Sequence, residues 1–136
     1  MIKNAEMGKE LVLTVSNKMG TLANVSKVLA DHGINIEGVA GYAMGNEAKI
    51  TLVADDVLRA SDALKKAGFK AVETIEVVVV ELENKQGAMK GITAKLSDAK
   101  IDIRYIYGTT CSGGCAASTL IVSTVDNEKA LVIFKG

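Results

Sequence analysis

Two short polar loops carry the groups in this sequence that are best suited to hold a small molecule. Asn17-Lys18-Met19-Gly20 stands between a strand-like and a helix-like stretch, and Asn84-Lys85-Gln86-Gly87 repeats it 67 residues later. A helix N-terminus offers backbone N–H groups and the positive end of the helix dipole, which suit a carboxylate. The glycines lack a Cβ and let a ligand approach the backbone closely. Asn before a Gly turn is also common turn chemistry, so the pattern alone leaves both interpretations open.

Cys111 and Cys115 form the other pair that could do chemistry. They supply two metal ligands where structural zinc needs four, and the lone His32 lies in the other half of the chain. Redox dithiols favour a two-residue spacing at a helix start, whereas this Gly-rich segment is typical of a hairpin tip. We expect reduced thiols and no metal, and a thiol or metal site here stays an alternative function.

The sequence shows no arrangement of residues that is typical of a catalytic site. Nucleophilic catalysis needs a nucleophile, a base and a group that orients it, and the single His32 has no Ser or Cys beside it in such an arrangement. The sequence also lacks a phosphate-binding Gly-x-x-x-x-Gly-Lys-Ser/Thr loop and a dinucleotide fingerprint. We therefore expect no catalytic residue and no cofactor.

Charge and hydropathy narrow the classes of partner. The 136 residues carry 16 basic and 16 acidic side chains, with no run of Lys or Arg, which argues against a nucleic-acid surface. The sequence has no stretch of roughly 18 apolar residues for a membrane helix, and its start lacks the apolar centre of a signal peptide. These features predict a cytoplasmic protein with no membrane or nucleic-acid partner.

The chain contains two copies of one pattern of elements. Val25 recurs as Ile92 at the same 67-residue offset, and Ile50 matches Leu120 after the offset has grown to 70. Apolar residues alternate in the expected strands and recur at helical spacing in the expected helices, with Gly, Asn and Asp between them. The first copy is predicted to contain strands at 10–16, 34–42 and 49–54 and helices at 22–29 and 56–67.

Residues 71–83 connect the copies and are too many for one ordinary strand. They are interpreted as the last strand of the first copy passing directly into the first strand of the second. The second copy continues as a helix at 89–96, strands at 101–107 and 118–125 and a helical stub from Asn127.

This order predicts an α+β chain of two ferredoxin-like βαββαβ modules, residues 1–75 and 76–136, with helices on one face of antiparallel sheets. The second module is truncated at its C-terminus and lacks its last strand. The unpaired sheet edge that this leaves needs a cover, which sheet-to-sheet joining between the two modules or between two chains would supply. We expect a homodimer.

The two loops resemble those of the ACT domain. Val15 to Leu22 and Asp31 to Ile36 are similar to that family's strand, Asn-x-Pro-Gly-x-Leu loop, helix and Gly-x-Asn-Ile segment, although Met19 and Gln86 stand where the family has Pro. With Tyr105-Ile-Tyr107 after Asp102-Ile103 of the second copy, residues 9–136 are similar to free-standing tandem-ACT proteins.

The resemblance implies a regulatory or sensor protein that binds an amino acid beside the loop between the first strand and first helix, near a module or dimer interface. We expect Asn17 and Asn35 to return to one edge of the sheet and together hold the ammonium and carboxylate. Asp102, at the position equivalent to Asn35, would repel a carboxylate. The alternative is a non-catalytic regulatory subunit that binds a metabolic enzyme and no ligand. The expected ligand-binding residues are Asn17, Met19, Gly20, Thr21, Leu22, Asn35, Ile36, Asn84, Gly87, Ala88, Met89 and Asp102.

Overall fold

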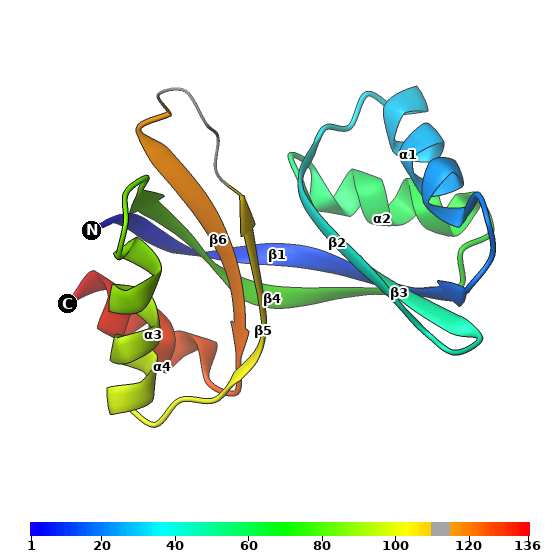
Figure 1. Cartoon of the computed structure of the whole chain (residues 1–136). Coiled ribbons are helices and arrows are strands. Elements are labelled where there is room, and N and C mark those ends of the chain that lie inside the picture. The colour runs from blue at the N-terminus through cyan, green and yellow to red at the C-terminus, as the bar shows by residue number, and fades with distance from the viewer. Residues whose placement is uncertain (110–114) are drawn as a thin grey trace. The chain divides into compact units, whose positions relative to one another are not determined.

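The computed structural model describes residues 1–109 and 115–136 and contains strands and helices in the order expected from the repeat (Figure 1). The strands are β1 (Ile2–Ser16), β2 (Ile36–Met44), β3 (Glu47–Ala54), β4 (Ala71–Glu83), β5 (Ile103–Thr109) and β6 (Ala117–Thr124). The helices are α1 (Thr21–Asp31), α2 (Val57–Lys66), α3 (Ala88–Asp98) and α4 (Asn127–Lys135).

The chain divides into two compact units. One, called module A, is Lys9–Ile75, and the other, called module B, combines Met1–Gly8 with Glu76–Gly136. The division expected from the sequence was 1–75 and 76–136, so the difference lies in the first eight residues, which group with the second copy. β1 and β4 each contribute one part to module A and another part to module B.

Module A places two helices against an antiparallel sheet. β3 pairs with β1 on one side and with β2 on the other, and β4 is the next neighbour of β1. Alternating residues of β1 face the helices, so that Leu11 and Leu13 are fully buried against Val25 and Leu29 of α1. The Asp56 carboxylate accepts the backbone N–H of Arg59 and caps α2, as its position before the helix predicts.

Module B repeats this arrangement, with α3 and α4 side by side against its strands (Figure 1). β6 pairs antiparallel with β4 and with β5. Val78, Val80 and Leu82 of β4 point into the core that contains Ile92 and Phe134 of the two helices. Both modules therefore have the ferredoxin-like α+β fold, and this prediction is confirmed.

The strand that the second copy lacks at its end comes from the beginning of the chain. Residues 2–8 of β1 lie beside β4, where the carbonyl of Met1 accepts the Glu83 N–H at 2.8 Å. Ala5 is buried in the core of module B, and Ile2 and Met7 pack against it. The expected edge of module B is thus covered within one chain, which is one of the two covers that the sequence left open.

The stub expected after Asn127 is a nine-residue helix. The Asp126 carboxylate accepts the Lys129 N–H, and the Asn127 side chain accepts from the N–H and hydroxyl of Thr124. The amide of Asn127 also donates to the carbonyl of Glu76 in β4. These bonds anchor the start of α4, so a short C-terminal segment is enough to complete the second helix of module B. Among the described residues, no helix is long and apolar enough to span a membrane.

Candidate functional site

Module A has a pocket of about 320 Å³ beside its first loop. This pocket, called pocket A, is lined by the end of β1, the loop from Asn17 to Lys18, the first turn of α1 and the facing parts of β2 and β3. Thr21 and Leu22 come from the helix start, and Tyr42 and Lys49 come from the paired strands β2 and β3. The predicted loop therefore does line a hollow of small-molecule size.

Module B has a pocket of about 300 Å³ at the equivalent place, called pocket B. Ten residues line it, and every one has a counterpart in the lining of pocket A at the 67- or 70-residue offset. Examples are Lys85 for Lys18, Met89 for Leu22, Gly108 for Gly41 and Leu120 for Ile50. The hollow is therefore a feature of the repeated fold, present in both copies.

Left-handed glycines start α1 and α3. Gly20 has φ +88° and Gly87 has φ +85°, a conformation that a residue with a Cβ adopts only with strain. Neither helix has a side-chain cap or an acidic residue in its first turn. The helix starts can therefore offer N–H groups to an anion without competition from a side chain of their own first turn.

The two loop asparagines hold their loops in place. The Asn17 amide donates to the carbonyl of Gly45 at 3.1 Å, and its backbone N–H donates to Asn46. The Asn84 amide donates to the carbonyl of Cys115 at 3.1 Å. Asn17 thus ties its loop to the turn between β2 and β3, and Asn84 ties its loop to the residues just before β6. This is the turn role that the sequence left open.

Asn35 and Asp102 do not join these pockets. The Asn35 carbonyl accepts the N–H of Asp55, just after β3, whereas Asn17 bonds to Asn46, just before β3. At ~3.4 Å per residue, the eight residues of β3 separate these bonds by about 27 Å. The expectation that Asn17 and Asn35 share one edge is wrong, because β1 and β2 both run antiparallel to β3, so the end of one and the start of the other lie at opposite ends.

The same separation holds in module B. The Asp102 carbonyl accepts the N–H of Val125 just after β6, and Asn84 bonds to Ala116 just before it.

The remaining predicted residues are divided between surface and core. Met19 is fully exposed and Met89 partly so, whereas Ala88 is buried in module B. Ile36 packs against the core of module A at the start of β2. Of the twelve predicted residues, the pockets are lined by Asn17, Thr21, Leu22, Asn84, Ala88 and Met89.

The strands opposite the loops supply pocket-lining residues that were not predicted from the sequence. Gly41 of β2 and Gly108 of β5 occupy equivalent places, and a Cβ on Gly108 would clash with Leu120 and the carbonyl of Thr119. Their common 67-residue offset was the signal available in the sequence.

The charges of the two pockets differ. Pocket A is lined by Lys18 and by no acidic residue. Lys49 also belongs to the lining, but its pairing with Thr14 and Tyr42 places its side chain on the sheet face opposite the buried Ile50. Pocket B is lined by Lys85 and by Glu83, whose carboxylate lies 3.1 Å from the Lys85 ammonium. The Lys85 ammonium and the chain's amino group lower the pKa of the Glu83 carboxyl below its usual value.

The cysteine hypothesis falls largely outside the described residues, because Cys111 is not among them. Cys115 is disulfide-bonded, so the expected reduced thiol is wrong for this residue. Within residues 1–109 and 115–136, the His, Cys, Asp and Glu side chains form no group of three or more that could hold a metal ion.

Comparison with protein families gives a match over residues 7–135 to the family described as the ACT domain pair. The chain belongs to this family. The resemblance noted from the loops is thereby confirmed, and the match spans both modules. Comparison with curated proteins gives no match.

Solved structures share the fold of this ACT domain pair. A protein from Bacteroides thetaiotaomicron is 25% identical with a TM-score of 0.87, over 98% of this chain and 90% of that one. The ligand-free regulatory subunit of aspartate kinase from Thermus thermophilus is 15% identical with a TM-score of 0.68, over 98% and 96%. Aspartokinase III from E. coli, in complex with lysine and aspartate, is 21% identical with a TM-score of 0.56, over 96% of this chain and 30% of that one.

Proposed function

We propose that this ACT domain pair is a non-catalytic regulatory protein that binds a small molecule, an amino acid, beside the loop between β1 and α1. The observation that carries the proposal is the pair of equivalent pockets. Two copies that differ at most positions retain a hollow at the same ten places. The ACT domain pair is a regulatory fold, and the aspartokinase structure above holds lysine and aspartate.

In pocket A, the start of α1 and the side chain of Lys18 supply groups for a ligand carboxylate. Thr21 supplies a hydroxyl, and Leu22 and Ile50 supply apolar contact. Asn17 keeps the loop against the β2–β3 turn, and Gly20 gives it the left-handed residue. In this proposal Asn35 and Asp102 have no contact with the ligand.

The test is a thermal-shift screen of the purified chain against the twenty amino acids at millimolar concentration. A ligand at 100 times its dissociation constant stabilises the folded state by about 2.7 kcal/mol, a shift of several degrees in so small a protein. The shift should disappear in Gly20→Trp and persist in Gly33→Trp. Gly33 is a matched control because it also has positive φ and open space around it, at the other end of α1. No shift with any amino acid would contradict the proposal.

A second candidate is a detached regulatory subunit that acts by binding an enzyme without a metabolite. The observation in its favour is the length of the Thermus thermophilus regulatory subunit, which matches this chain almost end to end. Under this candidate, amino acids leave the melting temperature unchanged and an enzyme co-purifies with the chain.

We also propose that the protein acts in the cytoplasm as a homodimer. The dimer is proposed because β2 and β5 are edge strands with backbone groups that another strand can pair. Analytical sedimentation of the purified chain distinguishes a dimer from a monomer.

A further inference from the structure

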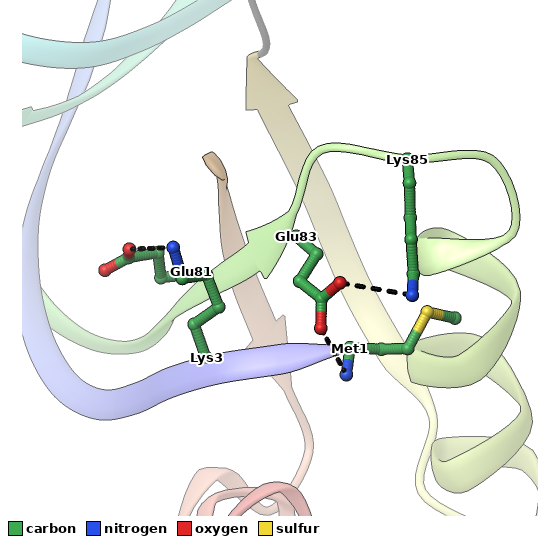
Figure 2. Close-up of polar contacts among 5 residues, drawn as sticks. All are labelled: Met1, Lys3, Glu81, Glu83 and Lys85. Carbon is green, nitrogen blue, oxygen red and sulfur yellow. Dashed lines mark ion pairs between the residues drawn. The ribbon is translucent and has the colours of Figure 1, made fainter. Parts of the chain in front are cut away.

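Asn84 joins the loop of pocket B to the residues just before β6. Its side-chain amide donates to the carbonyl of Cys115 at 3.1 Å, and its backbone N–H donates to the carbonyl of Ala116 at 3.2 Å. Another polar contact of the loop, between the Lys85 ammonium and the Glu83 carboxylate, connects it to the end of β4 and not to β6 (Figure 2). Asn84 thus links this wall of pocket B to the segment that contains Cys115.

Module A makes the same two bonds to a tight turn. Asn17 donates to the carbonyls of Gly45 and Asn46, which connect β2 directly to β3. Since the two strands are paired as far as Met44 and Glu47, their ladder holds both carbonyls in position. The anchor of the loop in pocket A therefore depends on backbone pairing.

The equivalent connection in module B is longer and contains a disulfide-bonded residue. The offset between the copies grows from 67 to 70 across it, so it has 70 − 67 = 3 more residues than the connection in module A. A longer connection holds its ends less tightly. Cys115, at the position of Gly45, is disulfide-bonded, and a disulfide restricts the freedom of the segment around it. The disulfide thus supplies in module B the restraint that the tight turn supplies in module A.

The disulfide at Cys115 is open to reductants. Cys115 is exposed, and exposed disulfides are the ones that exchange readily with external thiols. In the cytoplasm, where the chain is proposed to act, a disulfide is usually transient and serves catalysis or redox sensing. The bond at Cys115 therefore has the properties of a reversible contact.

We propose that the disulfide at Cys115 is a redox-sensitive anchor for the loop of pocket B. In the oxidised chain it holds the Cys115 carbonyl in place for the Asn84 amide, and its reduction loosens the loop while pocket A keeps its own anchor. Reduction by a dithiol transfers two electrons and two protons: the S–S bond breaks, two thiols form in the chain, and the dithiol becomes a disulfide. The inference adds regulation to the proposed function, on which it rests for the statement that such hollows bind a ligand.

The experiment is a redox titration of the purified chain in mixtures of reduced and oxidised glutathione. Alkylation of free thiols, followed by mass spectrometry, gives the oxidised fraction. If the disulfide favours the bond from Asn84, that bond must favour the disulfide by the same factor. Asn84→Ala should therefore shift the equilibrium roughly two- to tenfold toward the reduced chain. Asn17→Ala removes the equivalent bond in module A and should leave the equilibrium unchanged.

Hydrogen exchange of the wild-type chain, followed by NMR, tests the loop without any substitution. The Ala88 N–H donates to the Lys85 carbonyl across the loop of pocket B, and the Thr21 N–H makes the equivalent bond to Lys18 in pocket A. Dithiothreitol should speed the exchange of the Ala88 amide roughly two- to tenfold, because the loop opens more often once its anchor is released. The Thr21 amide should exchange at the same rate in both states.

Each contrary result has its own meaning. A redox equilibrium that Asn84→Ala leaves unchanged, or that Asn17→Ala shifts equally, would overturn the inference. Equal exchange of the Ala88 amide with and without dithiothreitol would also overturn it. These measurements use no amino acid, so their failure leaves the proposed function standing. The expected redox shift together with an amino-acid screen that shows no binding would support the anchor and remove the proposed function.

Discussion

Modules A and B contain the same elements, but they are assembled from the chain in different ways. Module A is one continuous stretch, Lys9–Ile75, whereas module B joins Glu76–Gly136 to the first eight residues. Residues 2–8 supply the strand that follows the second helix in a complete βαββαβ unit. The difference shows that the strand completing one copy of a repeat can come from a segment that precedes the other copy.

The two pockets make a second comparison. Their walls coincide at ten positions, yet Ser16 of pocket A is replaced by Glu83 in pocket B. The backbone of the loop and the glycines determine the hollow, and these are alike in both copies. A side chain at its rim can change without harming the core, so the two hollows differ in charge while their fold stays the same.

The largest effect is expected from a charge placed on the strand that completes module B. Ala5 is 3% exposed within that core, so Ala5→Asp should destabilise the protein. We expect a loss on the order of 5 kcal/mol in the free energy of unfolding, because the carboxylate would be buried without a partner. Urea denaturation measures it. Asn4→Asp adds the same charge at an exposed neighbour and should change stability by less than about 0.5 kcal/mol. Equal effects of the two would show that residues 2–8 do not belong to the core of module B.

The equivalence of the two cores can be tested by one substitution made twice. Leu29 of α1 and Leu96 of α3 are matched by the repeat and are almost completely buried in their own modules. Leu29→Ala and Leu96→Ala should each lower the free energy of unfolding by about 2–5 kcal/mol through lost burial and the cavity left behind. Chemical denaturation of both variants gives the comparison. A loss below about 1 kcal/mol for one of them would mean that its module tolerates the cavity and that the cores are not equivalent.

The smallest effect concerns the carboxylate present only in pocket B. The pKa of Glu83 is lowered from its ordinary 4.5, first by the hydrogen bond with Lys85 and then by the chain's amino group. A lowered pKa in the folded state adds stability that is fully present above pH 4.5 and is lost as the pH falls through the lower folded value. The wild type should therefore exceed Glu83→Gln in melting temperature at neutral pH, and this small difference should vanish in acid.

Salt should reduce the Glu83 effect as well, because the three groups are open to solvent. Ser16→Gln, at the matched position of pocket A, should show no such dependence on pH. A difference between the wild type and Glu83→Gln that stays constant from neutral to acid pH would contradict the role of the ion pairs.

Much of the local structure was predictable because it depends on neighbours in the chain. The 13-residue stretch Ala71–Glu83 forms one strand that serves both modules, as its length predicted. Asp56 caps its helix and Gly20 adopts the left-handed conformation, because caps and turns are decided by a few adjacent residues. The β-strand at residues 2–8 was not predicted, since Ile2, Ala5 and Met7 are separated by polar residues and gain their burial only from β4 and the helices of module B.

The sequence by itself determined the repeat, the α+β class, the family and the two loops that line the pockets, because apolar periodicity and turn residues are local properties that recur at a fixed offset. Only the tertiary structure decided which distant residues share a site. It separated Asn35 from Asn17 by the length of β3, brought Gly41 to the loop, and placed Glu83 against Lys85 and Met1. The direction and register of paired strands determine these distances, and both depend on contacts between residues far apart in the chain.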